Sequence, residues 1–143
     1  MDIPIALLEE LVAEAEIYYF GKETALGVPE HLHVCVKKNG KLYLFTACTS
    51  QIDTIYRYLS HSATDPNTIP CLSPNAGNGF HTLTFVNCNQ VYEYDSDAFL
   101  KELSGGRVKK MEGRLAAEEM LMLVKGIRLS RTVSDAIKRL FDE

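Results

Sequence analysis

The sequence predicts an α+β fold in which a small antiparallel barrel carries added N- and C-terminal helices. Alternating apolar and polar residues indicate four or five short strands, and an Asn-Gly pair between two of them indicates a hairpin. Apolar residues at helical spacing mark both ends of the chain. So few strands close most naturally into a small, strongly bent barrel.

The composition fits one domain over residues 1–143 and excludes several classes of protein. Of the 143 residues, 46% are hydrophobic and 24% are charged, close to the average of soluble globular chains. Every apolar run is far shorter than the about 20 residues of a membrane span. Residues 1–11 lack the basic n-region of a secretory signal. We therefore expect a cytoplasmic protein with no membrane partner.

The first predicted element is an N-terminal helix within residues 1–20, starting at Ile3. Asp2 can cap it, Pro4 stands in the first turn where its missing N–H costs nothing, and Gly21 ends it. Its apolar stripe consists of Leu7, Leu8, Leu11, Val12 and Ala15. We expect this helix to cover part of the barrel-like core, which spans residues 29–127.

A β-hairpin has the strongest pattern in the sequence. Residues His31–Val36 alternate, Leu42–Thr46 form the returning strand, and the turn contains Asn39-Gly40. An Asn-Gly pair favours the positive φ angles that a two-residue hairpin turn requires. We expect the core to receive Val34, Val36, Leu42 and Leu44 from this hairpin.

A short helix over residues 53–59 follows, and then an irregular polar loop over residues 60–79, rich in Pro, Asn and Gly. Two further strands are predicted over residues 82–86 and 90–94. The three residues between these strands form either a tight turn or a bulge.

The remaining predicted elements are mostly helical. A short helix begins at Ser96 or Asp97 and ends at Gly105-Gly106, residues 107–111 form a candidate last strand, and a helix covers residues 115–127. A C-terminal helix within residues 130–143 opens at Thr132, whose partner Asp135 makes an approximate capping box.

The cysteines and histidines match no metal motif. The four cysteines contain no C-x-x-C pair, so we expect reduced, buried thiols that serve packing. His31 and His33 face the same side of a strand, but a metal site needs at least one further ligand and no motif supplies it. Glycine-rich phosphate loops are also missing. We expect no metal and no cofactor.

Residues 47–51 place two hydroxyls and an amide at the end of the second hairpin strand. Such groups can hold a phosphate or a backbone oxygen. Alternatively, Ser50 only caps the helix that follows.

The order of several motifs resembles that of the MazF/PemK/Kid toxin family. The resemblance includes the strand after the His pair and the strand ending in Cys48-Thr49-Ser50-Gln51. It continues with residues 86–91, and then with residues 108–115 followed by Glu118-Glu119-Met120. It covers residues 29–127 in order, through short motifs.

This resemblance implies an SH3-like barrel, a homodimer and metal-independent cleavage of single-stranded RNA. It also implies an antitoxin protein that blocks the site. In the family an arginine opens the first matched strand, and here that position is His31, which lacks the fixed bidentate charge of guanidinium. The family's Thr or Ser after the second matched strand corresponds to Thr49 or Ser50.

RNA cleavage without a metal needs a base, an acid and a group that stabilises the phosphorane. An antiparallel hairpin centred on Asn39-Gly40 brings its two ends together, so we predict a catalytic set there. The predicted catalytic residues are His31, Thr49 and Ser50, and the predicted substrate-binding residues are His33, Lys37, Gln51 and Arg57.

The alternative is a non-catalytic barrel module that binds a protein partner or nucleic acid. The net charge is −4, but residues 101–143 are basic on balance, which permits a local anionic partner. Solvated helix faces explain the same charges. Residues 116–134 vaguely resemble a helix-turn-helix, with a turn longer than usual for that motif.

Overall fold

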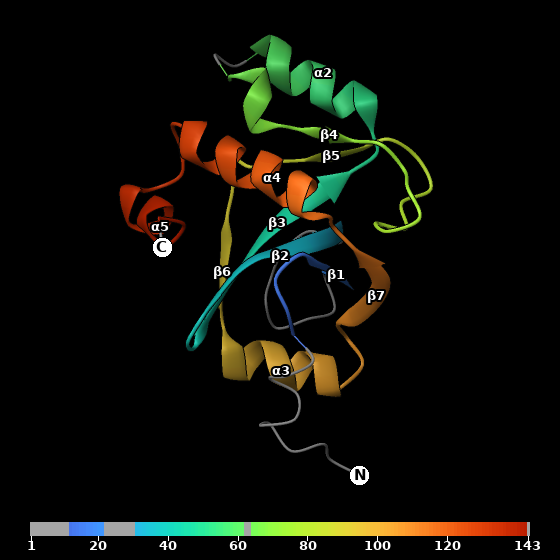
Figure 1. Cartoon of the computed structure of the whole chain (residues 1–143), viewed down its shortest axis with the longest axis vertical. Coiled ribbons are helices and arrows are strands. Elements are labelled where there is room, and N and C mark those ends of the chain that lie inside the picture. The colour runs from blue at the N-terminus through green and yellow to red at the C-terminus, as the bar shows by residue number, and fades with distance from the viewer. Residues whose placement is uncertain (1–11, 22–30, 62–63, 143) are drawn as a thin grey trace.

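The computed structural model describes residues 12–21, 31–61 and 64–142, and Figure 1 shows their arrangement. They form an α+β fold with a curled antiparallel sheet and several helices, as predicted. The strands are β1 (Glu16–Phe20), β2 (His31–Asn39), β3 (Leu42–Thr49), β4 (Cys71–Leu72), β5 (Thr84–Val86), β6 (Tyr92–Asp95) and β7 (Lys109–Arg114). The helices are α2 (Ile52–His61), α3 (Ser96–Ser104), α4 (Ala117–Leu129) and α5 (Asp135–Arg139), with the 3-10 helix η1 (Pro66–Thr68) between α2 and β4.

The predicted hairpin is confirmed and forms the centre of the sheet. The strand order is β4-β5-β3-β2-β1-β7, and β6 pairs with another part of β3. Asn39 pairs with Leu42 across the turn, where Gly40 has a φ of +60°. Of the hairpin residues expected in the core, Val34, Val36 and Leu44 are buried in one hydrophobic cluster, and the half-buried Leu42 packs against it.

β5 and β6 extend along β3 one after the other and do not pair with each other. Both run antiparallel to β3: Cys48 pairs with Val86 of β5, and Phe45 pairs with Tyr92 of β6. The residues between them leave the ladder, and Cys88 and Asn89 form a turn, but this turn joins two strands that run in the same direction along β3 and not a hairpin. The turn carries Asn89 to the end of α4, where the Ser130 hydroxyl donates to Asn89 Oδ1 over 2.8 Å.

Residues 16–20 form strand β1, so the predicted N-terminal helix is wrong for this part of the chain; residues 3–11 lie outside the described residues. β1 pairs with β2 on one side and β7 on the other. Aromatic and β-branched residues favour such a strand, and Ile17, Tyr18 and Phe20 are buried in it. Just before it, Ala15 has a φ of 76°, which is incompatible with a right-handed helix.

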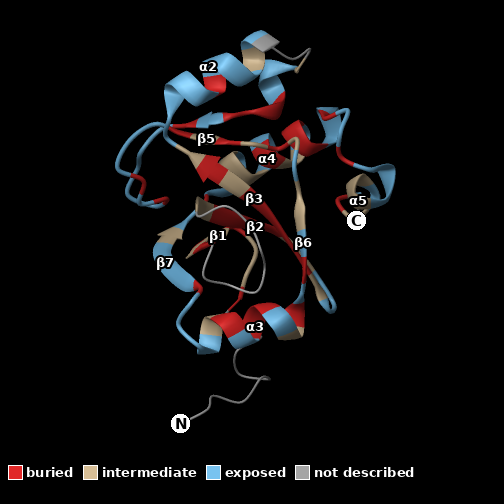
Figure 2. Cartoon of the chain, turned by 180° about the vertical axis from the view of Figure 1, so that it is seen from behind, coloured by how far each residue is buried: buried red, intermediate tan, exposed pale blue. Residues whose placement is uncertain are grey.

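Apolar side chains of the sheet form two hydrophobic clusters, one on each face. Figure 2 shows the buried residues of the strands in red. Leu123 and Ile127 of α4 belong to one cluster, with apolar residues of the hairpin. On the other face, Phe99 of α3 packs its ring against aromatic rings of the sheet, 4.8 Å from Phe45 and 5.7 Å from Phe20 between centroids. The β2–β3 hairpin therefore contributes to both clusters.

The segment predicted as a polar loop over residues 60–79 contains ordered elements. It includes the end of α2, η1, and β4, which pairs with β5. Thr68, Ile69 and Leu72 are buried. The polar composition of the segment does not indicate this burial, because the burial comes from a distant element: α4 packs closely against η1. A Cβ at Gly126 of α4 would lie only 3.1 Å from Asn67 O.

The C-terminal elements start a few residues away from the predicted positions. α4 follows the N-cap Ala116, whose N–H donates to the Glu119 carboxylate over 2.9 Å. α5 follows Ser134, whose hydroxyl accepts from a backbone N–H of the helix. The predicted capping box at Thr132 and Asp135 is therefore wrong.

All four cysteines are free thiols, as predicted, but Cys71 is exposed in β4 and the prediction that it is buried is wrong. The other three, Cys35, Cys48 and Cys88, are buried. Burial raises the pKa of each of these three thiols to about 12. Such thiols are poor nucleophiles, because the thiolate is the reactive form.

Candidate active site

His31 and Thr49 lie beside each other at the open end of the β2–β3 hairpin. The register pairs Leu32 with Cys48, so the first residue of β2 lies next to the last residue of β3. His31, Thr49, Ser50 and Gln51 line one pocket of about 460 Å³. The structure thus gathers the three residues predicted as catalytic and one of those predicted to bind substrate.

A second histidine, His81, lines the same pocket from a distant part of the chain. It lies just before β5, and β5 pairs with the end of β3 through Phe85 and Thr49. His81 is exposed, whereas His31 is half-buried. His81 is not among the predicted site residues, because the pairing that brings it there is a long-range contact between strands.

The loop before this second histidine is held by the buried side chain of Asn78, which is 2% exposed. Asn78 Oδ1 accepts from the backbone N–H groups of Asn75 and Phe80, at 3.1 and 3.0 Å. Its Nδ2 donates to Ser73 O over 3.0 Å and to Glu119 Oε2 of α4 over 2.9 Å. These bonds use both amide hydrogens and fix the loop before any ligand binds.

The two hydroxyls of the pocket differ in their hydrogen bonds. Thr49 Oγ1 accepts from the backbone N–H of Gln51 over 3.1 Å at the start of α2, and Gln51 Oε1 accepts from the Thr54 hydroxyl over 3.3 Å. Ser50 is exposed, and its hydroxyl makes no hydrogen bond with another described residue. The interpretation of Ser50 as a helix cap is therefore wrong. Its hydroxyl can serve a ligand.

His33 lies in the core, which does not fit the predicted contact with substrate. Its ring stacks on Phe20 with 4.0 Å between centroids, and no part of the residue is exposed. Its Nδ1 is 2.9 Å from the carbonyl oxygen of His31. Burial lowers the pKa of His33 to about 4, so the ring is neutral at pH 7. We infer that His33 supports the backbone of His31.

Neither cation predicted to bind substrate lines this pocket. Lys37 pairs with Leu44 towards the turn of the hairpin, at the opposite end from His31. Arg57 is exposed on α2, outside the pocket wall. The predicted contribution of Lys37 does not fit this geometry, because strand spacing separates the two hairpin ends.

No family model matches the sequence, and the search of curated proteins finds no significant relative. None of the helices in the described ranges is long and apolar enough to cross a membrane. Within the same ranges, no three His, Cys, Asp or Glu side chains gather as they would around a metal ion. The pocket itself is thus the basis for assigning a function.

The pocket combines groups that transfer protons with groups that bind a phosphate. Histidine changes its charge near neutral pH, and two histidines at one pocket can act as a base and an acid. The hydroxyls of Thr49 and Ser50 can donate to phosphate oxygens. The arrangement is suited to phosphoryl transfer on a substrate that supplies its own nucleophile.

Proposed function

We propose that the protein is an endoribonuclease that cleaves single-stranded RNA without a metal ion. The observation that supports this proposal is the single pocket lined by His31, His81, Thr49 and Ser50. RNA supplies its own nucleophile, the ribose 2′-hydroxyl. Cleavage then requires only a base, an acid and donors that stabilise the developing negative charge.

In the proposed reaction, His31 accepts the proton of the 2′-hydroxyl, and the 2′-oxygen attacks the adjacent phosphorus. The bond between phosphorus and the 5′-oxygen breaks, and protonated His81 gives its proton to that oxygen. The products are a 2′,3′-cyclic phosphate and a 5′-hydroxyl. The hydroxyls of Thr49 and Ser50 and the amide of Gln51 donate to the non-bridging oxygens of the phosphorane.

The resemblance to MazF/PemK/Kid toxins supports the same activity and extends the proposal. By this resemblance the curled sheet is of the SH3-like barrel type, and the protein acts as a homodimer in the cytoplasm. It is the toxin of a toxin–antitoxin pair, and the antitoxin protein covers the pocket. His31 replaces the family's arginine, so the second histidine compensates as the partner in proton transfer.

Cleavage of a fluorescently labelled single-stranded RNA by the purified protein, in the presence of EDTA, tests this function. We expect His31→Ala, His81→Ala and Ser50→Ala each to lower the cleavage rate by about 10²-fold or more.

Ser104→Ala is the matched control, because Ser104 is an exposed serine at the end of α3 and outside the pocket. It should cleave at the wild-type rate. If inhibitor-free wild-type protein leaves RNA intact, or if all three pocket variants cleave normally, the endoribonuclease proposal is wrong. A binding module then becomes the better description.

A further inference from the structure

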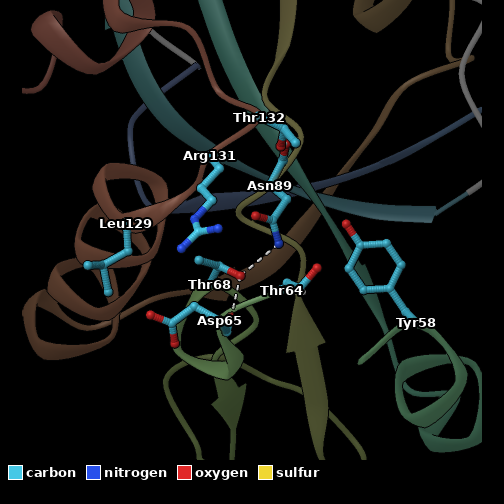
Figure 3. A pocket seen from close by; sticks show the side chains of 8 residues that line it. All are labelled: Tyr58, Thr64, Asp65, Thr68, Asn89, Leu129, Arg131 and Thr132. Atoms are coloured by element: carbon cyan, nitrogen blue, oxygen red, sulfur yellow. Dashed lines mark hydrogen bonds between the residues drawn. The ribbon is translucent and has the colours of Figure 1, made fainter. Parts of the chain in front are cut away.

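A second pocket, larger than the candidate active site, is shown in Figure 3, and its wall includes neither His31 nor His81. It has a volume of about 670 Å³ and lies between α2, η1, the turn after β5 and the segment that follows α4. In Figure 3, Tyr58 lies on one side of it, and Leu129 and Arg131 lie on the other. Its wall consists of Tyr58, Thr64, Asp65, Thr68, Asn89, Leu129, Arg131 and Thr132.

This pocket connects to the candidate active site. A smaller pocket of about 300 Å³ shares Tyr58 with it. The same smaller pocket shares His31, Thr49 and Gln51 with the candidate active site. The three pockets are therefore neighbours, with Tyr58 lining both members of one pair and His31 lining both members of the other.

Hydrogen bonds fix the shape of the large pocket in the absence of any ligand. The Thr68 hydroxyl donates to Asp65 O over 2.6 Å, and Asn89 Nδ2 donates to Thr68 Oγ1 over 2.7 Å. Asn89 also accepts from two hydroxyls, Ser130 at its Oδ1 and Thr132 at its backbone oxygen, at 2.8 and 2.7 Å. A preformed wall lowers the entropy cost of ordering a ligand.

The groups exposed in the large pocket suit a nucleotide. Tyr58 presents a partly exposed aromatic ring, on which a base can stack. Arg131 is exposed and makes no ion pair with another described residue, so its guanidinium can bind a phosphate. Asp65 Oδ1 accepts from the Asn67 N–H over 2.9 Å, which leaves the other carboxylate oxygen for an N–H of the base.

We propose that the large pocket binds a nucleotide of the same RNA strand whose phosphate is cleaved at His31. The proposal rests on the proposed function and adds where a flanking nucleotide lies. Its base stacks on Tyr58, and Arg131 contacts its phosphate. The smaller pocket between them, lined by Tyr58 and His31, receives the backbone that joins this nucleotide to the cleaved phosphate.

Binding of a non-cleavable strand separates this proposal from catalysis. The probe is a fluorescein-labelled single-stranded RNA of about 16 nucleotides, random in sequence, with every 2′-hydroxyl methylated. Tyr58→Leu should weaken its binding about 10-fold, the usual effect of losing one stacked base. Arg131→Gln should reduce the slope of log K against log salt concentration by about 0.7, the value for one phosphate contact on a single strand.

Two exposed residues outside the pockets provide matched controls for the substitutions of Tyr58 and Arg131. Tyr56, on the same helix as Tyr58, is 64% exposed and outside the three pockets. Arg139, on α5, is exposed and also outside them. Tyr56→Leu and Arg139→Gln should bind the probe as the wild type does, and thermal unfolding of all four variants checks that they fold.

The outcomes distinguish the two proposals. If the wild type cleaves unmodified RNA but Tyr58→Leu and Arg131→Gln bind the probe like their controls, the nucleotide pocket is wrong and the endoribonuclease proposal stands. If the probe binds with the expected dependence on Tyr58 and Arg131 while unmodified RNA stays intact, the pocket stands and the endoribonuclease proposal is wrong. A wild type that does not bind the probe at low salt overturns the pocket.

Discussion

The buried imidazole of His33 links the stability of the protein to pH. The side chain is stacked on Phe20 and completely buried, and its pKa falls from an ordinary value of 6.5 to about 4 because burial disfavours the charged ring. The contact of Nδ1 with the carbonyl of His31 opposes this shift but is outweighed. The folded protein therefore keeps this ring neutral at pH values where an exposed histidine is protonated.

We expect the free energy of unfolding to decrease as the pH falls from about 6.5 to about 4. In this range the unfolded chain binds a proton at His33 and the folded protein does not, so acid favours unfolding. The loss from this one residue approaches about 3 kcal/mol. Urea denaturation at a series of pH values measures it.

His33→Phe keeps an aromatic ring beside Phe20 and removes the titrating group, so the corresponding part of the pH dependence should disappear. His81→Asn is the control, because His81 is exposed and its loss should leave that part unchanged. If both variants retain the wild-type pH dependence, His33 is not its source.

The neighbours of His31 could be predicted from the sequence, whereas the burial of His33 could not. The Asn39-Gly40 turn sets the hairpin register, and the register alone brings His31 to Thr49 and Ser50. The burial of His33 depends on Phe20 of β1, a residue for which the sequence predicts a helix. Because β1 was predicted as a helix, the burial of His33 in β2 could not be predicted.

Among the elements, those with local signals were predictable and those held by distant contacts were not. The hairpin, α2 and α3 follow from a turn pair, helical periodicity and a capping residue. β1 depends on pairing with β2 and β7 on its two sides. The sequence predicts a helix for β1 because the residues before it have apolar side chains at helical spacing. Strand pairing overrides such local preference.

Strand β7 comes very close to the loop of the second histidine at Gly113. A Cβ at this position would lie 2.0 Å from Asn78 O and 2.6 Å from Asn78 C, both backbone atoms. Gly113→Ala must therefore displace the loop that precedes His81. We expect it to destabilise the fold by about 3 kcal/mol and to lower RNA cleavage, measured by urea denaturation and by the cleavage rate.

Gly77→Ala provides a control on the same loop. A Cβ there would lie 3.4 Å from Asn75 Oδ1, an ordinary contact, and neither glycine has a positive φ. If Gly77→Ala has wild-type stability and activity, the effect of Gly113→Ala comes from the contact between β7 and Asn78. Equal effects of the two substitutions would contradict that assignment.

At the scale of the whole molecule, the central hairpin couples the two hydrophobic clusters. Val34 and Leu44 face the cluster under α4, and Cys35 and Phe45 face the cluster under α3. Successive residues of a strand point to opposite faces, so neither cluster can lose its packing without disturbing the same two strands. We expect the described fold to unfold as one unit.

Phe99→Ala in α3 and Leu123→Ala in α4 test this coupling. Both side chains are fully buried, on opposite faces. Each substitution should shift one common urea transition to lower urea concentration. The free energy of unfolding should fall by about 4 kcal/mol for Phe99→Ala and by about 3 kcal/mol for Leu123→Ala. Circular dichroism and tyrosine fluorescence should report the same midpoint.

Leu121→Ala is the control, because Leu121 lies on the same helix as Leu123 but is 69% exposed; it should change the stability by less than about 0.5 kcal/mol. Two separate transitions, one sensitive to each buried residue, would show that the clusters unfold independently.

The charged outer strand β7 limits how two molecules can meet. β7 ends the strand order on one side and carries Lys109, Lys110, Glu112 and Arg114, all exposed. Near its end, the N–H of Arg114 donates to Gly77 O over 2.8 Å, so the loop already occupies that main-chain donor. Charged side chains and occupied donors discourage one sheet from continuing into another molecule. Fibre-like growth of the sheet across β7 is thereby disfavoured.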